Sequence, residues 1–291
     1  MTSPVVPNGT QDAGSVIHDI GYQRYDGPRL GRWYAVRSLY THALRTAFGM
    51  GRSGKAKVFP WLVVGIVTLV AAVVTAVRSQ LGEPVMEYTD LPEAMVVLVI
   101  IFCAVVGPEL VSRDLRSGVL PLYFSRPLHR GDYAMAKLAA TISATFLLLA
   151  GPMLLMFVGG AFTLDSLRDV WSEFGDFAQG LAYAALMAIV FSSIAVLVAS
   201  LASRRAIAAA VVVAVFLVTA PVAAVLSFSS NETVNRLAGI VNPASLVGLL
   251  GHWLFDPPRD NTWGPVYAAV AAGLVALCAG LLLLRYRKVA Q

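Results

Sequence analysis

The chain has 291 residues, of which 57% are hydrophobic and 13% are charged, and its mean hydropathy is +0.71. A soluble domain carries roughly 25% charged residues, so this composition excludes an ordinary soluble fold and indicates an integral membrane protein. The two cysteines, Cys103 and Cys278, both lie in apolar runs, which argues against a disulfide framework. The first fifty or so residues are polar, so no signal peptide is expected.

The first 57 residues divide into two cytoplasmic segments. Residues 1–27 are predicted to be a tail, and the composition of its first fifteen residues is typical of disorder. Residues 28–57 are predicted to hold an amphipathic helix and a basic hinge. Apolar side chains, among them Trp33, recur along one face of this helix, so we expect it to lie in the membrane interface. The alternative is a solvated helix with no specific role. The basic residues of the helix are Arg29, Arg32, Arg37 and Arg45.

The stretch "GMGRSGKAK" at 49–57 nearly matches a phosphate-binding loop. Gly49, Gly54 and Lys55 have the right spacing, but Ala56 stands where a hydroxyl would hold magnesium. No buried strand is expected before it, because a surface helix precedes it. We therefore expect a flexible basic hinge at the lipid headgroups and no nucleotide site.

Six stretches are long and apolar enough to span a bilayer, which takes about 20 residues of helix. Because lipid cannot satisfy open backbone groups, the sequence predicts an all-α integral membrane protein with six transmembrane helices over 58–284. Gly151-Pro152 predicts a kink or an interruption of the third span, and "SRR" at 203–205 predicts a tight hairpin. The outer segment 229–264 is expected to form short helices at the outer leaflet. The spans are 58–77, 91–110, 134–162, 178–202, 206–227 and 265–284.

The distribution of charge predicts the orientation. With six spans both termini lie on one side, and most of the 22 Lys and Arg residues lie on that side, whereas most of the 17 acidic residues lie opposite. Both termini are therefore predicted to be cytoplasmic, with 285–291 as a basic tail. This bias accounts for the pI near 9.4, so no nucleic-acid partner is expected.

The sequence offers no catalytic constellation, so no catalytic residue, metal or cofactor is predicted in this chain. Ser192 and Ser193 have no nearby base at membrane depth and are expected to bond the preceding helical turn. Charge at mid-membrane would suggest an ion path, but Glu93 and Lys137 lie near helix ends. The histidines have no metal-ligand spacing. They are His18, His42, His129 and His252.

The loop 109–132 is far longer than a hairpin between two spans needs. If the second span continues as a helix, Glu109, Arg113 and Arg116 fall along one stripe, and Gly118 and Pro121 then stop the helix. The cluster "LPLYF" that follows is apolar and is flanked by Arg116 and Arg126, and Asp132 is expected to cap the third span. From the residues alone, this is either a docking surface or a loop folded back on the membrane.

The segment "GPELVSRDLRSGVLPLYFSRPLHRGDYAMAK" resembles the signature of the type-2 ATP-binding-cassette (ABC) exporter permeases. In that family a glutamate closes the second helix. An (I/V)-S-(R/K)-(D/E) run, R-x-G-x-L, S-R-P, an aromatic residue and a lysine follow. The six-span topology, the helix before the first span and the large outer segment extend the likeness over roughly 20–285. The matching positions are Glu109, Val111 to Asp114, Arg116, Gly118, Leu120, Ser125 to Pro127, Tyr133 and Lys137.

The resemblance implies that 109–121 is a coupling helix seated in a cleft of a separate ATPase subunit. Two such subunits, with ATP and magnesium bound to them, would drive a pair of permeases in the bacterial cytoplasmic membrane. The second permease would be another copy of this chain or a paralogue. In this reading Arg113 and Arg116 pair with partner carboxylates, Leu115 and Leu120 fill its groove, and Glu109 pins the loop. The implied interface residues are Glu109, Arg113, Asp114, Leu115, Arg116, Gly118, Leu120, Pro121 and Arg126.

Two other functions remain open: a membrane anchor or membrane-embedded enzyme without ABC coupling, and a passive channel. The uncharged interior favours an apolar or amphiphilic cargo over a small polar ion. Small residues four apart, Ala269 with Gly273 and Ala276 with Gly280, are typical of close helix packing. They could pack between two copies or within one chain.

Overall fold

The computed structural model describes residue 27 and residues 30–125, 128–164, 166–202, 204–255 and 262–288. Within these ranges every regular element is a helix, so the predicted all-α fold is confirmed. Arg29 and Arg126, like most of the N-terminal tail, lie outside them. The chain divides into residues 1–30 and residues 31–291, and the helices below belong to the second unit.

Six helices in the described part of the chain are long and apolar enough to cross a membrane, as predicted. The second span, α4, continues with little interruption into α5 (Ser112–Ser117). The chain is therefore a multi-pass helical membrane protein. The helices that carry the spans are α2 (Gly54–Leu81), α4 (Val96–Leu110), α7 (Arg130–Ala161), α8 (Leu167–Leu201), α9 (Arg205–Ser227) and α12 (Gly264–Lys288).

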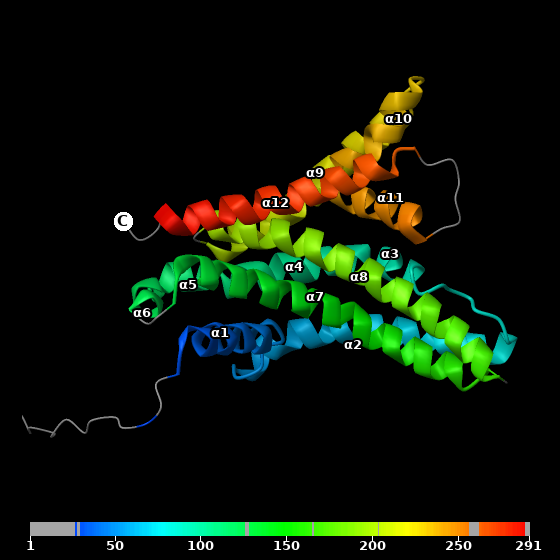
Figure 1. Ribbon diagram of the computed structural model, residues 1–291, viewed down its shortest axis with the longest axis horizontal. Helices are drawn as coiled ribbons and strands as arrows, with labels where there is room; N and C mark the ends of the chain where they lie inside the picture. The colour runs from blue at the N-terminus through cyan, green and yellow to red at the C-terminus, as the bar shows by residue number, and fades with distance from the viewer. Residues whose placement is uncertain are drawn as a thin grey trace, which may run out of the picture. The chain divides into compact units, whose positions relative to one another are not determined.

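α4 and α8 form the centre of the packing and are mostly buried, whereas α2, α9 and α12 are mostly exposed. α7 packs against α8, α1 and α2, while α4 packs against α8 and α9 (Figure 1). The outer faces of α2, α9 and α12 carry exposed leucines and valines over their length. Such continuous apolar surface is what a lipid-facing helix presents. Examples are Leu62, Leu69, Leu217, Val225, Leu277 and Leu284.

The predicted N-terminal amphipathic helix is α1 (Arg32–Ala47), and it lies lengthwise along α7. Arg32 contacts Asp132 at 2.6 Å, and the Tyr40 hydroxyl donates to Ser143 Oγ at 2.9 Å. The two contacts come in the same order along both helices, so α1 and α7 run side by side in the same direction. The residues of α1 that face the core are Leu39, Ala43 and Ala47, with Val36, Tyr40, Leu44 and Phe48 half-buried beside them.

The near-match to a phosphate-binding loop is a packed turn between α1 and α2. Gly49 has φ +69°, and a Cβ there would lie 2.6 Å from the carbonyl oxygen of Ala56. A helix and not a strand precedes the turn, and Arg52 within it pairs with Glu109. The turn is thus held by its own packing and by an ion pair, and the flexibility expected of this hinge stays a prediction.

Two details of α7 differ in their outcome. The helix is continuous through Gly151-Pro152, so the interruption is wrong, while the alternative, a kink, stays a prediction. Proline removes only one backbone donor, and Pro152 is itself buried in helix packing that supports this stretch. The expected cap is present: the backbone N–H of His129 donates to Asp132 Oδ2 at 3.2 Å.

The segment between the fifth and sixth spans forms short helices, as predicted. They are α10 (Glu232–Ala238), η1 (Gly239–Val241) and α11 (Pro243–Phe255), and the chain bends by 115° between η1 and α11. Their place in the outer leaflet stays a prediction. The predicted hairpin between α8 and α9 is confirmed, because α8 ends at Leu201 and α9 begins at Arg205.

Candidate functional site

One end of the helices brings together charged residues of the loop 109–132. There α5 and α6 (Leu120–Phe124) lie beside the start of α7 and the end of α12 (Figure 1). Gly118, with φ +64°, separates α5 from α6 in a backbone conformation that glycine adopts readily. Pro121 was expected to stop the helix together with Gly118. It lies instead in the first turn of α6, where its missing N–H costs nothing. We call this the basic end, meaning the described residues of 48–57, 109–137, 202–205 and 285–288.

At the basic end the carboxylate of Glu109 is surrounded by three arginines. Its side chain is only 10% exposed. One oxygen pairs with Arg52 and lies 3.5 Å from Nη1 of Arg113, and the other accepts from Nη1 of Arg205 at 2.5 Å. Arg52 belongs to the turn before α2 and Arg205 to the first turn of α9. Glu109 therefore ties α4 and α5 to the starts of α2 and α9.

A second buried cluster, around Asp114, fixes α5 to α7. Its Oδ2 accepts from the Tyr133 hydroxyl at 2.7 Å and lies 2.9 Å from Nζ of Lys137. Tyr133 and Lys137 are both buried, and the Tyr133 ring packs against Tyr123 of α6 and Tyr286 of α12. This cluster joins α5 and α6 to the start of α7 and the end of α12.

Glu109 and Asp114 are engaged in these contacts within the chain, so only some of the predicted interface residues lie on the surface. Arg113 is 57% exposed, and Arg116, Gly118 and Pro121 are exposed. Leu115 is half-buried, but Leu120 is buried against its own chain. Leu122, which the sequence analysis did not single out, is instead 70% exposed. The side chains of α5 and α6 whose exposure is described thus form an open surface that is basic and carries the apolar Leu122.

A groove of about 1220 Å³ lies between α1, the turn before α2, and α5 with α6. Glu109 and Asp114 both line it, but their charges are balanced by the pairs described above. Arg52, Arg113 and Lys137, which make those pairs, line the groove as well. Arg45 adds a further positive charge, so the groove is electropositive and able to attract an acidic partner. Its basic lining residues are His42, Arg45, Arg52, Arg113 and Lys137.

The basic residues predicted for the interfacial helix take different positions. Arg32 forms a two-pronged pair with Asp132 at the start of α7, and this hydrogen bond raises the pKa of Arg32. Arg37 and Arg45 are exposed, and Trp33 is 81% exposed. α1 is therefore fixed to α7 by one arginine, while its other described basic residues and its tryptophan face outward.

The side chains examined for catalysis and metal binding make local contacts. Ser193 donates to the carbonyl of Ile189, as expected, and the Ser192 hydroxyl lies 3.2 Å from that of Thr145. Cys103 and Cys278 are buried free thiols. Within the described residues no group of three or more His, Cys, Asp or Glu side chains could hold a metal ion.

Two polar clusters at the opposite end of the helices were missed by sequence reasoning. Arg78 makes a two-pronged pair with Glu173, at 2.5 and 2.9 Å, and the Tyr88 hydroxyl donates to the same carboxylate. Burial is the main cause that raises the pKa of Tyr88. The second cluster brings Glu93 together with Tyr183 and His252. Lone charges at the edges of apolar runs were the available signal, but their partners lie far away in the sequence.

No protein-family model matches the chain, and no curated protein matches it significantly.

Proposed function

We propose that the chain is the membrane-spanning permease subunit of an ABC exporter that moves an apolar or amphiphilic substrate. In this function two separate ATPase subunits bind and hydrolyse ATP with magnesium, and two permease subunits form the pathway. The observation that carries the proposal is the construction of α5 and α6. Glu109 and Asp114 hold this element from the inside, while Arg116 and Leu122 are left open to a partner.

A coupling element must pass a push from its partner to the spans. Through Glu109 the element is tied to α2 and α9, and through Asp114 and Tyr133 it is tied to α7 and α12. A displacement of α5 and α6 is therefore transmitted to four spans besides α4. This supports a rigid-body reorientation of the spans driven from outside the chain.

The energy source is assigned to another chain because the residues nearest to a phosphate-binding loop do not form one. Gly49 and Gly54 lie in and after a turn between two helices, and this turn lacks the strand that precedes such loops. The motif resemblance over 107–137 names the class of the missing motor. The charge bias supports a cytoplasmic position for the basic end, in a bacterial cytoplasmic membrane.

A second permease subunit is supported by an open face of α12. Ala269, Gly273 and Ala276 are exposed, and a Cβ added at Gly273 or Gly280 would meet nothing within 4 Å. These small residues are therefore not packed against their own chain, which favours contact with another copy or a paralogue.

The test is purification of the tagged chain from its native membrane in mild detergent. We expect an ABC ATPase, identified by mass spectrometry, to co-purify with ATPase activity that the chain alone lacks. Arg116→Glu combined with Leu122→Asp should abolish this association while the chain still inserts in the membrane. Arg116 and Leu122 are exposed and outside the buried clusters, so the substitutions spare the fold.

The matched control is Arg168→Glu, which reverses an exposed charge at the other end of the helices. This variant should keep the ATPase. Retention of the ATPase by the double variant, or transport by the purified chain without ATP, would contradict the proposal.

A further inference from the structure

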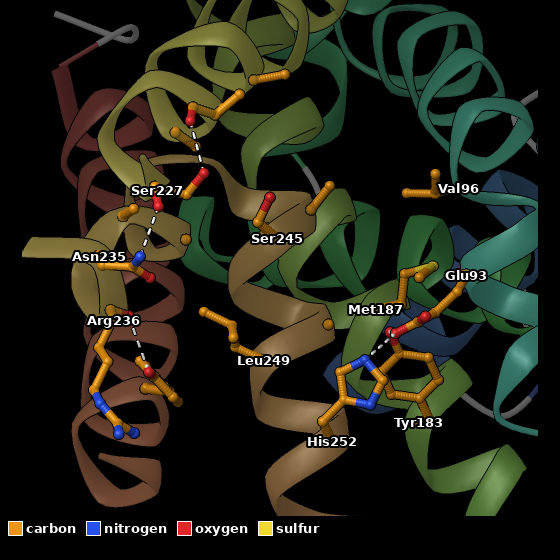
Figure 2. A pocket seen from close by; sticks show the side chains of 18 residues that line it. Glu93, Val96, Tyr183, Met187, Ser227, Asn235, Arg236, Ser245, Leu249 and His252 are labelled. Carbon is orange, nitrogen blue, oxygen red and sulfur yellow. Dashed lines mark hydrogen bonds and ion pairs between the residues drawn. The ribbon is translucent and has the colours of Figure 1, made fainter. Parts of the chain in front are cut away.

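A pocket of about 830 Å³ lies at the opposite end of the helices from the basic end, and Figure 2 shows side chains that line it. It is formed by α3 (Asp90–Ala94), α4, α8, α9, α10, η1, α11 and α12. Its volume falls within the roughly 300–1,000 Å³ of ordinary small-molecule sites. The pocket is large enough for a drug-sized amphiphile.

One side of the pocket holds a carboxylate in a fixed orientation. Glu93 Oε1 accepts from the Tyr183 hydroxyl at 2.8 Å and lies 3.5 Å from Nε2 of His252, as Figure 2 shows. Gly251 lies directly under the Tyr183 ring, and a Cβ there would overlap ring atoms. A Cβ at Gly248 would come 3.4 Å from Glu93 Oε1. Gly251 thus makes room for the tyrosine that orients the carboxylate, and Gly248 lies beside that carboxylate.

The other side of the pocket is apolar or internally satisfied. Ala220, Ala223 and Ala224 of α9 line it together with Leu249 of α11. Three of the polar side chains here are already engaged. Asn235 donates to the carbonyl of Ser227, Tyr267 donates to that of Arg236, and the Arg236 guanidinium pairs with Glu232 at 2.8 Å.

The approach to Glu93 is acidic. A smaller hollow of about 250 Å³ shares Glu93, Tyr183 and His252 with the main pocket. This hollow adds the carboxylates of Glu87 and Asp90, and the Glu93 side chain is 39% exposed between the two spaces. Glu93 therefore lies near two further carboxylates, those of Glu87 and Asp90, and one histidine, an arrangement that attracts cations.

From this geometry we propose that the pocket binds an amphiphile with a cationic amine headgroup. The amine lies against the Glu93 carboxylate, and the apolar chain lies along Ala220, Ala224 and Leu249. An amphiphile with the same apolar chain but an anionic headgroup is repelled by Glu93 and its acidic neighbours. Binding requires this chain alone, whereas the role of the amphiphile as exported cargo rests on the proposed function.

The experiment measures thermal unfolding of the full-length chain in a neutral detergent at pH 7. Decylammonium is the probe, and decyl sulfate and decanol are the anionic and neutral comparisons, all below micelle-forming concentrations. A ligand that binds only the folded state raises the unfolding temperature. We expect a saturable rise with decylammonium, a smaller or no rise with decanol, and none with decyl sulfate.

Glu93→Gln should weaken the apparent affinity for decylammonium by at least about tenfold, because it removes the charge that faces the amine. Glu83→Gln is the matched control, since Glu83 is an exposed acid that lines neither hollow, and it should bind like the wild type. Equal affinity in the wild type and Glu93→Gln, or stabilisation by decyl sulfate equal to that by decylammonium, would overturn the proposal.

If Glu93→Gln does not fold, Ala220→Leu decides the question. Residue 220 is exposed, so the larger side chain fills the pocket without entering the core and should reduce the affinity for decylammonium. Unchanged affinity in this variant would also overturn the proposal.

A further measurement with lysophosphatidylethanolamine distinguishes two sources of the amine. A rise in the unfolding temperature assigns the site to an amine-bearing lipid, and no rise assigns it to a free cationic amphiphile. These binding measurements use the purified chain alone. They therefore do not depend on whether an ABC ATPase co-purifies with it.

Discussion

The guanidinium of Arg205 lies 2.5 Å from the carboxylate of Glu109, although the two residues are 96 positions apart in the sequence. Arg205 begins α9, and Glu109 lies in the last turn of α4. Through this contact the start of the fifth span is linked to the segment that leads into α5 and α6. The same carboxylate also pairs with Arg52 before the first span.

Glu109→Gln should therefore destabilise the protein, because three guanidinium groups would lose their shared counter-charge. We expect a loss of about 2–3 kcal/mol, below the roughly 3–5 kcal/mol typical of a broken buried pair, since Arg113 and Arg205 are more than half exposed. Unfolding of the purified protein in neutral detergent measures the change. Glu232→Gln, which removes an exposed pair within α10, should cost no more than about 0.5 kcal/mol. Similar losses in both variants would show that Glu109 does not link the spans.

The Asp114–Lys137 pair predicts a non-additive pair of substitutions. Lys137→Met should leave the Asp114 carboxylate without its buried cation, and Asp114→Asn should leave the Lys137 ammonium without its anion. The two single variants together should lose more free energy of unfolding than the double variant does. Each single variant leaves one buried charge unpaired, whereas the double variant leaves neither. A double-mutant cycle of unfolding midpoints measures this coupling, which we expect at about 1–3 kcal/mol. Strict additivity would contradict the pairing.

Two glycines in the turn before α2 should differ in how much stability is lost when each is replaced by alanine. Both have positive φ, at 69° for Gly49 and 79° for Gly51, but only Gly49 faces a neighbouring backbone. Gly51→Ala should cost about 1 kcal/mol for the left-handed conformation. Gly49→Ala should cost distinctly more, because its Cβ would press on the carbonyl of Ala56. The yield of folded protein and its unfolding midpoint compare the two, and equal effects would show that the turn is loosely packed.

Tyr88 predicts a stability difference that depends on pH. Its pKa is raised above its ordinary value of 10.0 by burial first and by its hydrogen bond to Glu173 second. The folded state thus holds the proton more tightly than the unfolded state, so this stabilisation is complete below pH 10 and falls as the pH rises further. The unfolding temperature of the wild type should exceed that of Tyr88→Phe by a constant amount between pH 7 and 9. The difference should shrink above pH 10. A difference that grows with pH would contradict the hydrogen bond.

The open face of α12 predicts an effect on association. Gly273→Leu places a bulky side chain where nothing lies within 4 Å in the described chain, so the fold of one subunit should be unaffected. If the face contacts a second subunit, the variant should shift the purified protein toward monomer in light-scattering measurements. Leu277→Ala, an exposed change on the same helix that adds no bulk, is the comparison. An unchanged dimer in Gly273→Leu would place the interface elsewhere.

Much of the architecture was predictable because lipid imposes strict local requirements. The six spans, the hairpin between α8 and α9, the amphipathic helix before the first span and the short helices after α9 were all indicated by apolar length and turn residues. Backbone groups in lipid must be satisfied within a helix, so a long apolar run determines its own secondary structure. The interruption predicted at Gly151-Pro152 failed because burial of Pro152 in the helix packing outweighs one missing hydrogen bond.

The contacts of the candidate sites depended on the tertiary structure. The sequence singled out Glu109, Arg113 and Asp114. It did not indicate that Arg52 and Arg205 pair with Glu109. Nor did it indicate that Lys137 and Tyr133 contact Asp114. It also gave no sign that Leu120 is buried while Leu122 is exposed. Hydrophobic runs act locally along a helix, whereas ion pairs between spans depend on which helix faces meet. That choice belongs to packing, and it alone placed Glu93 beside Tyr183 at the edge of a pocket.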